Sequence, residues 1–329
     1  MPLPYLDAAA VIERVTAARA IAALSAALRD GSAPGHTPAR TAVPLGGGEL
    51  LLMPAQVGEH AGIKVASVAP GNPARGLARI QGVHLVLDAQ TLAPVAMLDA
   101  VALTLARTAA VSALAVAQLA VPQARHLVVV GTGPQALAHV RAITAVRPIE
   151  RVTIIGRSPG RVAALHGQLA ESGLAVEEFI DGDARRAGRP PGRSGATGAL
   201  AATGATDPLA GADIVACCTT AREPLFDSGR LADHATVVAI GSHEPTAREV
   251  DTALVRRAAV VVESRESALR EAGDILLAIA DGVPPQQAIT ATLPEVVRGE
   301  VRLPGGIPRL FKSVGEAWCD VVVAAAVLG

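Results

Sequence analysis

The sequence predicts an α/β protein in which a parallel sheet occupies the middle of the chain. Three observations lead to this prediction. Between residues 124 and 300 the chain contains short apolar runs without alternation, such as "HLVVVG", "RVTIIG", "DIVACC" and "TVVAIG". Such runs are typical of strands covered on both faces, and helix-like segments separate most of them. Half of the 329 residues are hydrophobic, which suits a large core and two domains.

The two ends of the chain mix strands and helices and predict a second, α+β domain. A helix near 7–29 precedes a hairpin-like pair in "TAVPLGGGELLLMPA" and further strands in "GIKVASVA" and "VHLVLD". A long helix follows Asp99, a favourable N-cap, and the C-terminal "FKSVGEAWCDVVVAAAVL" is one more helix. We therefore predict a substrate-binding domain from residues 1–122 plus 304–329 and a dinucleotide-binding domain from 123–303.

Composition excludes several classes of partner. The net charge is −1 without a basic block, so no nucleic acid is expected. The three cysteines lack the spacing of a metal site or a disulfide framework and fit a reducing cytoplasm. Charged residues in the first helix and the short C-terminal apolar run indicate neither a signal peptide nor a membrane anchor. The segment 184–208, rich in Gly, Ala, Pro and Arg, is interpreted as a flexible surface insertion.

The stretch "HLVVVGTGPQALAHV" has the order strand, glycine turn, helix. Gly131, Gly133 and Ala136 form a G-x-G-x-x-A motif. The first glycine permits the tight turn, the second lets the backbone approach a pyrophosphate, and the alanine permits close helix–strand packing. The free N–H groups of the following helix complete an anion site. In this context the motif predicts a Rossmann dinucleotide site.

The end of the next strand, "TIIGRSPGR", indicates which dinucleotide is bound. A carboxylate at this position would accept from the ribose 2′-hydroxyl of NAD, but the chain has Arg157, Ser158 and Arg161 and no acid. A guanidinium suits a 2′-phosphate because its donors form a planar fork. We therefore predict NADPH, with NADH as the weaker alternative. The other interpretation is that the arginines belong to a solvated helix start.

Three cations stand out in the domain built from the chain ends. Lys64 lies in "AGIKVASVA" and Arg107 in the almost wholly apolar "VALTLARTAAVSALAV". A buried cation is costly unless an anion pairs with it, so each predicts either an internal salt bridge or an anionic ligand. With Arg40 they could form a clamp for a substrate carboxylate.

These pieces resemble the ornithine cyclodeaminase/mu-crystallin family. The matching segments are "ART" (39–41), "GIKVAS" (62–67), "RTAAVSALA" (107–115), "GTGPQA" (131–136), "GRS" (156–158), "ALREAGD" (268–274) and "FKSVG" (311–315). They follow the order of the family and cover nearly the whole chain. The resemblance implies a Rossmann domain inserted in a substrate domain made from both chain ends. It also implies a homodimer in which the N-terminal strands of two subunits pair.

The resemblance also assigns roles to individual residues. It implies that Arg40, Lys64 and Arg107 hold the substrate carboxylate and that Glu271 is an acid at the ligand pocket. A plain helix-surface carboxylate is the alternative for Glu271. The implied contacts to the cofactor are Thr108, Thr132, Pro134, Gln135, Thr219, Ile240 and Ser313.

The segment "GSHEP" discriminates among the reactions of this family. Ornithine cyclodeaminases and alanine dehydrogenases carry an aspartate where this chain has His243, whereas the ketimine reductases lack it. The resemblance therefore favours an oxidoreductase of proline and lysine metabolism that reduces Δ1-pyrroline-2-carboxylate to L-proline and Δ1-piperideine-2-carboxylate to L-pipecolate. Lys64, His243 or a water would protonate the imine nitrogen. His243 could also be a hydrogen-bonded filler without a chemical role.

Three alternatives stay open at this stage. The first is ornithine cyclodeaminase activity, which the missing aspartate disfavours. The second is a crystallin-like protein that binds cofactor and ligand with little turnover. The third is an opine-like or diamino-acid synthase that joins an amine to a 2-oxo acid. The substrate expected in each case is a small molecule, and no metal is expected.

Overall fold

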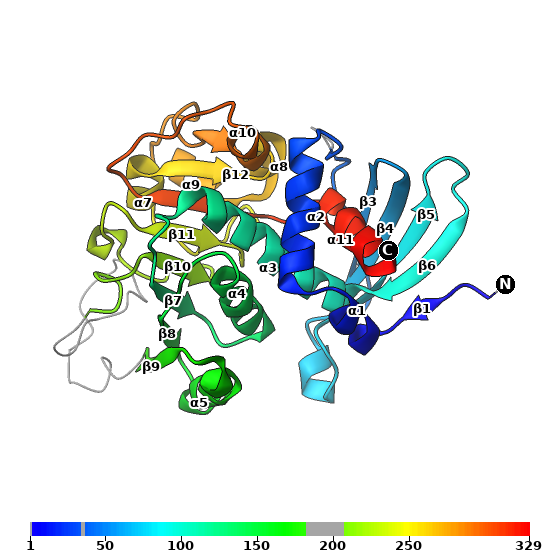
Figure 1. Ribbon diagram of the computed structural model, residues 1–329, viewed down its shortest axis with the longest axis horizontal. Coiled ribbons are helices and arrows are strands. Elements are labelled where there is room, and N and C mark those ends of the chain that lie inside the picture. Colours follow the sequence, from blue (N-terminus) through cyan, green and yellow to red (C-terminus); the bar gives the residue numbers. More distant parts are fainter. Residues whose placement is uncertain (1, 34–36, 182–206) are drawn as a thin grey trace. The chain divides into compact units, whose positions relative to one another are not determined.

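The computed structural model of the protein describes residues 2–33, 37–181 and 207–329 (Figure 1). Most of the predicted insertion 184–208 thus lies outside the described residues. Contacts divide the chain into two compact units: unit 1 is 1–111 with 315–329, and unit 2 is 112–314. The boundaries that we predicted, 122/123 and 303/304, fall inside unit 2. One reason is that residues 309–312 form a strand of its sheet.

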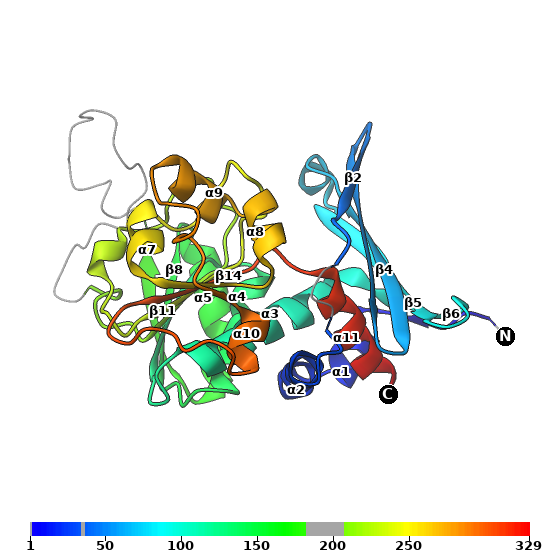
Figure 2. The same cartoon turned by 90° about the horizontal axis from the view of Figure 1, so that it is seen from above.

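Unit 1 is a six-stranded sheet with helices on one side. The strand order is β1-β6-β5-β4-β3-β2, antiparallel from β2 to β6, with β1 added in parallel to β6. The strands are β1 (Tyr5–Leu6), β2 (Thr41–Leu45), β3 (Gly48–Val57), β4 (His60–Val68), β5 (Ile80–Asp88) and β6 (Pro94–Asp99). The helices are α1 (Ala8–Arg14), α2 (Ala17–Arg29) and α11 (Ala317–Leu328), and a 3-10 turn, η1, spans Asn72–Arg75. Figure 2 shows α1, α2 and α11 on the same side of this sheet.

The two faces of this sheet differ in burial. Register places Met53, Lys64, His84 and Leu98 in one cross-strand row, and all four are buried. The neighbouring row on the opposite face is Pro54, Ile63, Leu85 and Met97, and all four are only half-buried. Because side chains alternate between faces, the first row faces the covering helices. The second row leaves an apolar face without a covering layer in unit 1.

Helix α3 (Ala100–Leu119) connects the units along the chain, and its first residues are capped by Asp99, whose Oδ1 accepts from the Ala102 N–H at 2.7 Å. It is long and apolar enough to cross a membrane, but 72% of its most apolar window is buried inside the protein. It is therefore a core helix of the kind that the sequence predicts.

Unit 2 contains a fully parallel sheet of eight strands in the order β13-β12-β14-β11-β10-β7-β8-β9. The strands are β7 (His126–Val130), β8 (Arg151–Gly156), β9 (Ala175–Ile180), β10 (Ile214–Cys217), β11 (Thr236–Ala239), β12 (Ala259–Val262), β13 (Ala291–Thr292) and β14 (Arg309–Lys312). The α-helices in the described part of unit 2 are α4 (Pro134–Thr144), α5 (Pro159–Leu169), α7 (Thr252–Arg257), α8 (Arg265–Glu271), α9 (Gly273–Ala280) and α10 (Leu293–Val297). The same part contains two 3-10 turns, η2 (Ala170–Ser172) and η3 (Ser228–Arg230). The predicted α/β class with a Rossmann-type sheet is confirmed.

Candidate active site

The glycine motif forms a tight turn between β7 and α4. Gly131 has a φ of +118°, and a Cβ there would lie 2.4 Å from the carbonyl oxygen of Cys218. Only glycine tolerates both conditions. At Gly133, the N-cap of α4, nothing lies within 4 Å of the position that a Cβ would take. The turn therefore requires glycine at position 131, and at Gly133 it is open on the side where a pyrophosphate would approach.

The start of α4 is suited to an anion. No side chain caps this helix, Pro134 occupies its first turn, and Ala136 is fully buried against the sheet. The uncapped N–H groups and the helix dipole favour a phosphate at this end. In the sheet, β7 lies between β8 and β10, and the strand order changes direction there. In open parallel sheets, ligands bind at such a switch point, beyond the carboxyl ends of the strands.

The strand after the glycine loop ends in exposed arginines. Arg157 and Arg161 are exposed, and neither side chain forms a hydrogen bond or ion pair with another residue in the described part of the chain. Ser158 between them is the N-cap of α5. At the end of β8, a Cβ on Gly156 would lie 2.7 Å from the Thr132 methyl group. This contact places the end of β8 directly beside the glycine loop.

Unit 1 contains a buried cluster of charged side chains on the inner face of its sheet. The Lys64 ammonium lies 2.8 Å from Oδ2 of Asp320, and Nε of Arg107 donates to Oδ1 of the same carboxylate at 3.0 Å. The exposed fractions of Lys64, Arg107 and Asp320 are 3%, 5% and 0%, so both ion pairs are shielded from water. Two cations therefore share one anion.

The charge imbalance alters the acid–base properties of the cluster. The pKa of Lys64 is lowered to about 8. Burial is the main cause, the positive charges of Arg107 and Arg40 add to the lowering, and Asp320 opposes it. Burial alone would raise the pKa of Asp320, but Lys64 and Arg107 lower it to about 2. Burial also lowers the pKa of His84, the neighbour of Lys64 across β4 and β5, to about 4. At neutral pH the cluster therefore holds a net positive charge with a neutral imidazole.

Arg40 reaches the same region through the segment before α11. Its Nη2 donates to the Gly315 carbonyl oxygen at 3.0 Å. Gly315 has a φ of +84°, and a Cβ there would lie 2.8 Å from Nη1 of Arg107. Glycine at 315 thus lets the chain pass closely over one guanidinium while its carbonyl accepts from another. Arg40, Lys64 and Arg107, separated by up to 67 positions in the sequence, are brought together; Thr108, next to Arg107, is buried.

Two members of this cluster were missed by sequence reasoning. Asp320 lies in "EAWCDVVVAAAVL", where a single acid in an apolar helix was the available signal for a buried counter-ion. His84 is fully buried, and neither of its ring nitrogens has a hydrogen-bond partner among the described residues. An imidazole inside the strand "VHLVLD" gave the same kind of signal.

The carboxyl ends of the unit 2 strands carry the other predicted residues. Thr219 and Ile240 follow β10 and β11 and are half-buried, and His243, three residues further, is exposed. Ser313, after β14, is buried, and its hydroxyl donates to Glu263 at 2.8 Å. Glu271 is 8% exposed and accepts from Nε of Arg270 at 2.8 Å, so its side chain is not on the helix surface.

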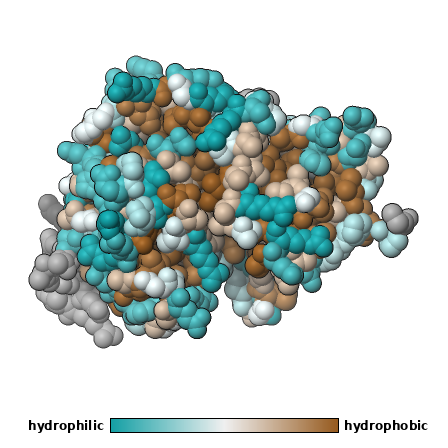
Figure 3. Space-filling model, in the orientation of Figure 1, coloured by the Kyte–Doolittle hydropathy of each residue, from teal (hydrophilic) through white to brown (hydrophobic). Residues whose placement is uncertain are grey.

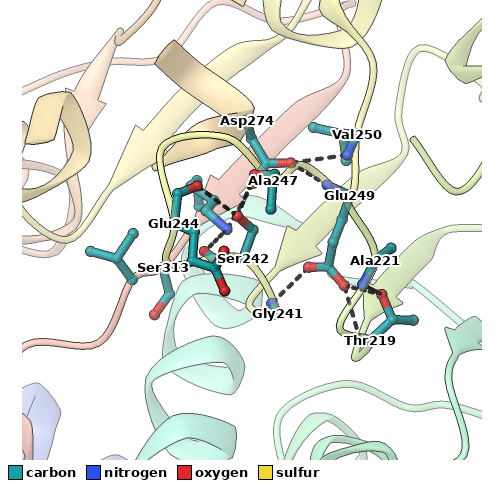
Figure 4. Close-up of polar contacts among 12 residues, drawn as sticks. Thr219, Ala221, Gly241, Ser242, Glu244, Ala247, Glu249, Val250, Asp274 and Ser313 are labelled. Atoms are coloured by element: carbon teal, nitrogen blue, oxygen red, sulfur yellow. Dashed lines mark hydrogen bonds and ion pairs between the residues drawn. The ribbon is translucent and has the colours of Figure 1, made fainter. Parts of the chain in front are cut away.

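A second buried charge cluster joins these strand ends and was also missed. It consists of Glu249, Asp274 and Lys312, all buried (Figure 4 shows the two acids). Asp274 and Lys312 form an ion pair of 2.8 Å, and Glu249 accepts backbone hydrogen bonds from the loops after β10 and β11. In the sequence "TAREVD" the glutamate resembles an ordinary surface acid. Within the described ranges, no group of three or more His, Cys, Asp or Glu side chains is arranged to hold a metal ion.

Comparison with known proteins places these features in a family context. A Δ1-pyrroline-2-carboxylate reductase from Bacillus thuringiensis subsp. konkukian is 35% identical over 295 residues, or 88% of this chain and 84% of the relative. A Δ1-pyrroline-2-carboxylate/Δ1-piperideine-2-carboxylate reductase from Azospirillum brasilense is 33% identical over 328 residues, or 97% and 93% of the two chains.

Solved structures of similar proteins point to the same family as these sequence relatives. The chain is similar to Thermococcus litoralis Δ1-pyrroline-2-carboxylate reductase in complex with NADH and L-proline, with a TM-score of 0.85, 27% identity, and coverage of 99% of this chain and 96% of the other. It is also similar to a probable ornithine cyclodeaminase from Bordetella pertussis Tohama I, with a TM-score of 0.80, 29% identity, and 99% and 96% coverage. The model of the ornithine cyclodeaminase/mu-crystallin family matches residues 5–182 and 195–328. The chain belongs to the ornithine cyclodeaminase/mu-crystallin family.

Proposed function

We propose that this protein reduces the cyclic ketimines Δ1-pyrroline-2-carboxylate and Δ1-piperideine-2-carboxylate, using a nicotinamide dinucleotide. Relatives with these names match most of the chain, and a similar structure holds NADH and L-proline. The observation that carries the proposal is that two buried cations, Lys64 and Arg107, lie together on the carboxylate of Asp320, with Arg40 close by at Gly315. Such cations can form charge-assisted hydrogen bonds to the carboxylate of a small substrate.

The clamp residues would act by binding and orientation. Arg40, Lys64 and Arg107 would hold the substrate carboxylate, and this fixes the planar imine in one orientation. Asp320 keeps the two buried cations in place before the substrate arrives. The bound nicotinamide would supply the hydride. The residues of the glycine loop, Gly131 to Ala136, together with Thr219, Ile240 and Ser313 at the strand ends, would hold the dinucleotide.

Proton supply is the second task of the chain. An imine carbon accepts hydride more readily when its nitrogen is protonated, and a donor works best with a pKa near the operating pH. Burial and two neighbouring guanidinium groups lower the pKa of Lys64 to about 8, which suits this role. His243 is a second candidate donor, and its exposed position also fits a filler without a chemical role. Glu271 would line the ligand pocket.

We propose NADPH as the preferred dinucleotide, with NADH as the weaker one. Arg157, directly after β8, and Arg161, in the first turn of α5, are exposed and follow the strand end that packs on the glycine loop, where a 2′-phosphate would be recognised. Replacing both arginines with alanine should raise the Kd of NADPH by roughly 10-fold or more and leave that of NADH nearly unchanged. Isothermal titration of wild type and the double variant with NADPH and with NADH tests this. An equal rise in the Kd of both dinucleotides would refute the preference.

We also propose that the protein is a homodimer that uses the uncovered face of the unit 1 sheet. That face carries the apolar row Pro54, Ile63, Leu85 and Met97, and the edge strand β2 is exposed along its whole length. In Figure 3, apolar residues lie at the surface over the strands of unit 1. Contiguous exposed apolar surface marks interaction sites. A monomer that is active and is shown to be monomeric by light scattering would refute the dimer. The cytoplasmic location of the protein stays a prediction.

The decisive experiment is a substrate panel. Both cyclic imines would be offered with NADPH and with NADH, and L-ornithine would be offered with NADP+ and with NAD+. We expect dinucleotide oxidation with the imines, and neither proline nor ammonia from ornithine. The similarity to a probable ornithine cyclodeaminase makes that activity the second candidate, and ornithine conversion without imine reduction would establish it. Tight binding without turnover would indicate a crystallin-like protein. A requirement for an amine together with a 2-oxo acid would indicate the synthase.

A further inference from the structure

Glu249 connects the ends of two neighbouring strands of unit 2 through a single carboxylate. Oε1 accepts from the backbone N–H of Thr219 at 2.9 Å and from its hydroxyl at 2.7 Å, directly after β10. Oε2 accepts from the N–H of Gly241 at 2.7 Å, directly after β11. Figure 4 shows the side chain placed between these two loops. Each strand end is therefore bound by a different oxygen of the same carboxylate.

The backbone of Glu249 is itself fixed by hydrogen bonds to a second buried carboxylate, that of Asp274. Oδ1 of Asp274, at the start of α9, accepts from the N–H groups of Glu249 and Val250 at 2.7 and 3.0 Å. Oδ2 of Asp274 pairs with Lys312 at the end of β14, and Lys312 donates to the carbonyl oxygen of Ser242 at 2.6 Å. The network thus fixes the end of β14 as well. Buried polar networks of this kind rigidify the loops that they join.

The connected strand ends lie beside the glycine turn. A Cβ on Gly131 would lie 2.4 Å from the carbonyl oxygen of Cys218, so the end of β10 packs directly on that turn. A Cβ on Gly241 would lie only 1.8 Å from the carbonyl oxygen of Thr219, so the ends of β10 and β11 are in equally close contact. A shift of either loop would therefore be transmitted to the turn.

We propose that Glu249 is a positioning residue for dinucleotide binding: its carboxylate holds the ends of β10 and β11 at the separation that the dinucleotide site requires. This inference rests on the proposed dinucleotide site at these strand ends. Glu249 acts through Thr219 and Gly241, because its own side chain is fully buried and used by those two residues.

The protonation state of Glu249 makes the role measurable. Burial raises its pKa to about 7, Asp274 adds to the rise, and Lys312 and the hydrogen bonds from Thr219 and Gly241 oppose it. The thiols of Cys217 and Cys218 also face this carboxylate; burial raises the pKa of both, so they stay neutral. A protonated carboxyl group accepts less well from the strand ends. Dinucleotide affinity should therefore fall as the pH drops through about 7.

The test is the Kd of NADH, measured by isothermal titration between pH 6 and 8 for wild type and E249Q. NADH is the probe because it lacks the 2′-phosphate of NADPH, which titrates near pH 6 itself. A glutamine has one acceptor oxygen and cannot serve both strand ends. We expect E249Q to raise the Kd roughly 10-fold or more at pH 8 and to remove the pH dependence.

Two further variants keep the inference open to refutation. D274N retains the acceptor oxygen for both N–H groups but removes a negative charge beside Glu249, so the fall in affinity should move to a lower pH. D213N is the matched control. Oδ2 of Asp213 accepts from the N–H groups of Arg125 and His126 at 2.8 and 2.9 Å, which joins β10 to β7 at their amino ends. We expect D213N to leave both the Kd and its pH dependence unchanged.

An unchanged Kd in E249Q, or an equal loss in D213N, would overturn the inference. If E249Q does not fold, as judged by circular dichroism, D274N decides, because an unmoved pH dependence in that variant contradicts the role. The outcome is separable from that of the proposed function. Wild type that binds NADH with the expected pH dependence but reduces no cyclic imine would refute the function and leave the role of Glu249 standing.

Discussion

The two units each bury a cluster of three charged side chains, but with opposite surpluses. In unit 1, Lys64 and Arg107 share Asp320, so the cluster carries one excess positive charge. In unit 2, Glu249 and Asp274 accompany Lys312, so the cluster carries one excess negative charge when both acids are ionised. The surplus in unit 1 suits an anionic ligand. The surplus in unit 2 is used internally, because backbone N–H groups surround the extra carboxylate.

The pKa shifts follow from this difference. Burial and neighbouring cations lower the pKa of Lys64 to about 8, whereas burial and a neighbouring acid raise that of Glu249 to about 7. In both cases burial is the largest cause of the shift, and a neighbouring charge of the same sign adds to it.

The largest expected effect comes from removing the carboxylate of Asp320, which pairs with both Lys64 and Arg107 in unit 1. D320N removes the carboxylate that pairs with both buried cations, Lys64 and Arg107, and breaking a buried pair in this way costs about 3–5 kcal/mol. The pKa of Asp320 is lowered from 3.8 to about 2, so its contribution is complete above pH 3.8 and is lost as the pH falls toward 2. Denaturant unfolding at pH 7 and at pH 3 measures the cost, which should shrink in acid.

The control for this variant is D99N, in the same unit. Asp99 caps α3, and asparagine caps a helix about as well as aspartate. D99N should therefore leave the free energy of unfolding nearly unchanged. An equally small effect for D320N would show that Lys64 and Arg107 do not need this carboxylate.

The next largest effect is expected on turnover. R107A removes a guanidinium that the clamp would use to orient the substrate carboxylate, and kcat/KM for the cyclic imine should fall at least roughly 100-fold, about 3 kcal/mol. R125A, which breaks an exposed ion pair with Glu150, is the control and should leave kcat/KM within about twofold. Normal imine reduction by R107A would refute the clamp.

The pH dependence of turnover tests the other cation. Below a pKa of about 8 Lys64 is charged, so it can hold the carboxylate and donate a proton; above it, both abilities are lost. Imine reduction should therefore decline as the pH rises through about 8, by at most roughly 10-fold per pH unit. K64R keeps its charge at every accessible pH and should remove this decline, even at a lower rate. The same decline in K64R would assign it to another group.

The sequence predicted the parts of this molecule that depend on local pattern. The glycine turn, the apolar strands of unit 2 and the buried cations Lys64 and Arg107 all follow from short segments or from the family resemblance. The partners of those cations could not be found in this way, because Arg107 meets Asp320 across 213 positions of the chain. Glu249 illustrates the same limit: its function depends on two loops that only the sheet order brings together.

The smallest effect is expected from an exposed link between the same two loops that Glu249 joins. Nη1 of Arg222, after β10, pairs with Glu244 at 2.7 Å, and its Nη2 donates to Thr246 at 3.0 Å. The side chains of Arg222 and Glu244 are 60% and 47% exposed, so water screens the pair and competes for its hydrogen bonds.

Such exposed pairs contribute roughly 0.2–1 kcal/mol, against a larger contribution from a buried carboxylate with three donors. R222A should therefore change the Kd of NADH by less than about threefold, with the same pH dependence as wild type, and should lower the free energy of unfolding by at most about 1 kcal/mol. Titration of R222A beside E249Q makes the comparison direct. A loss in R222A as large as that in E249Q would mean that any link between these loops suffices, whether buried or exposed, and that the surplus carboxylate in unit 2 has no special role.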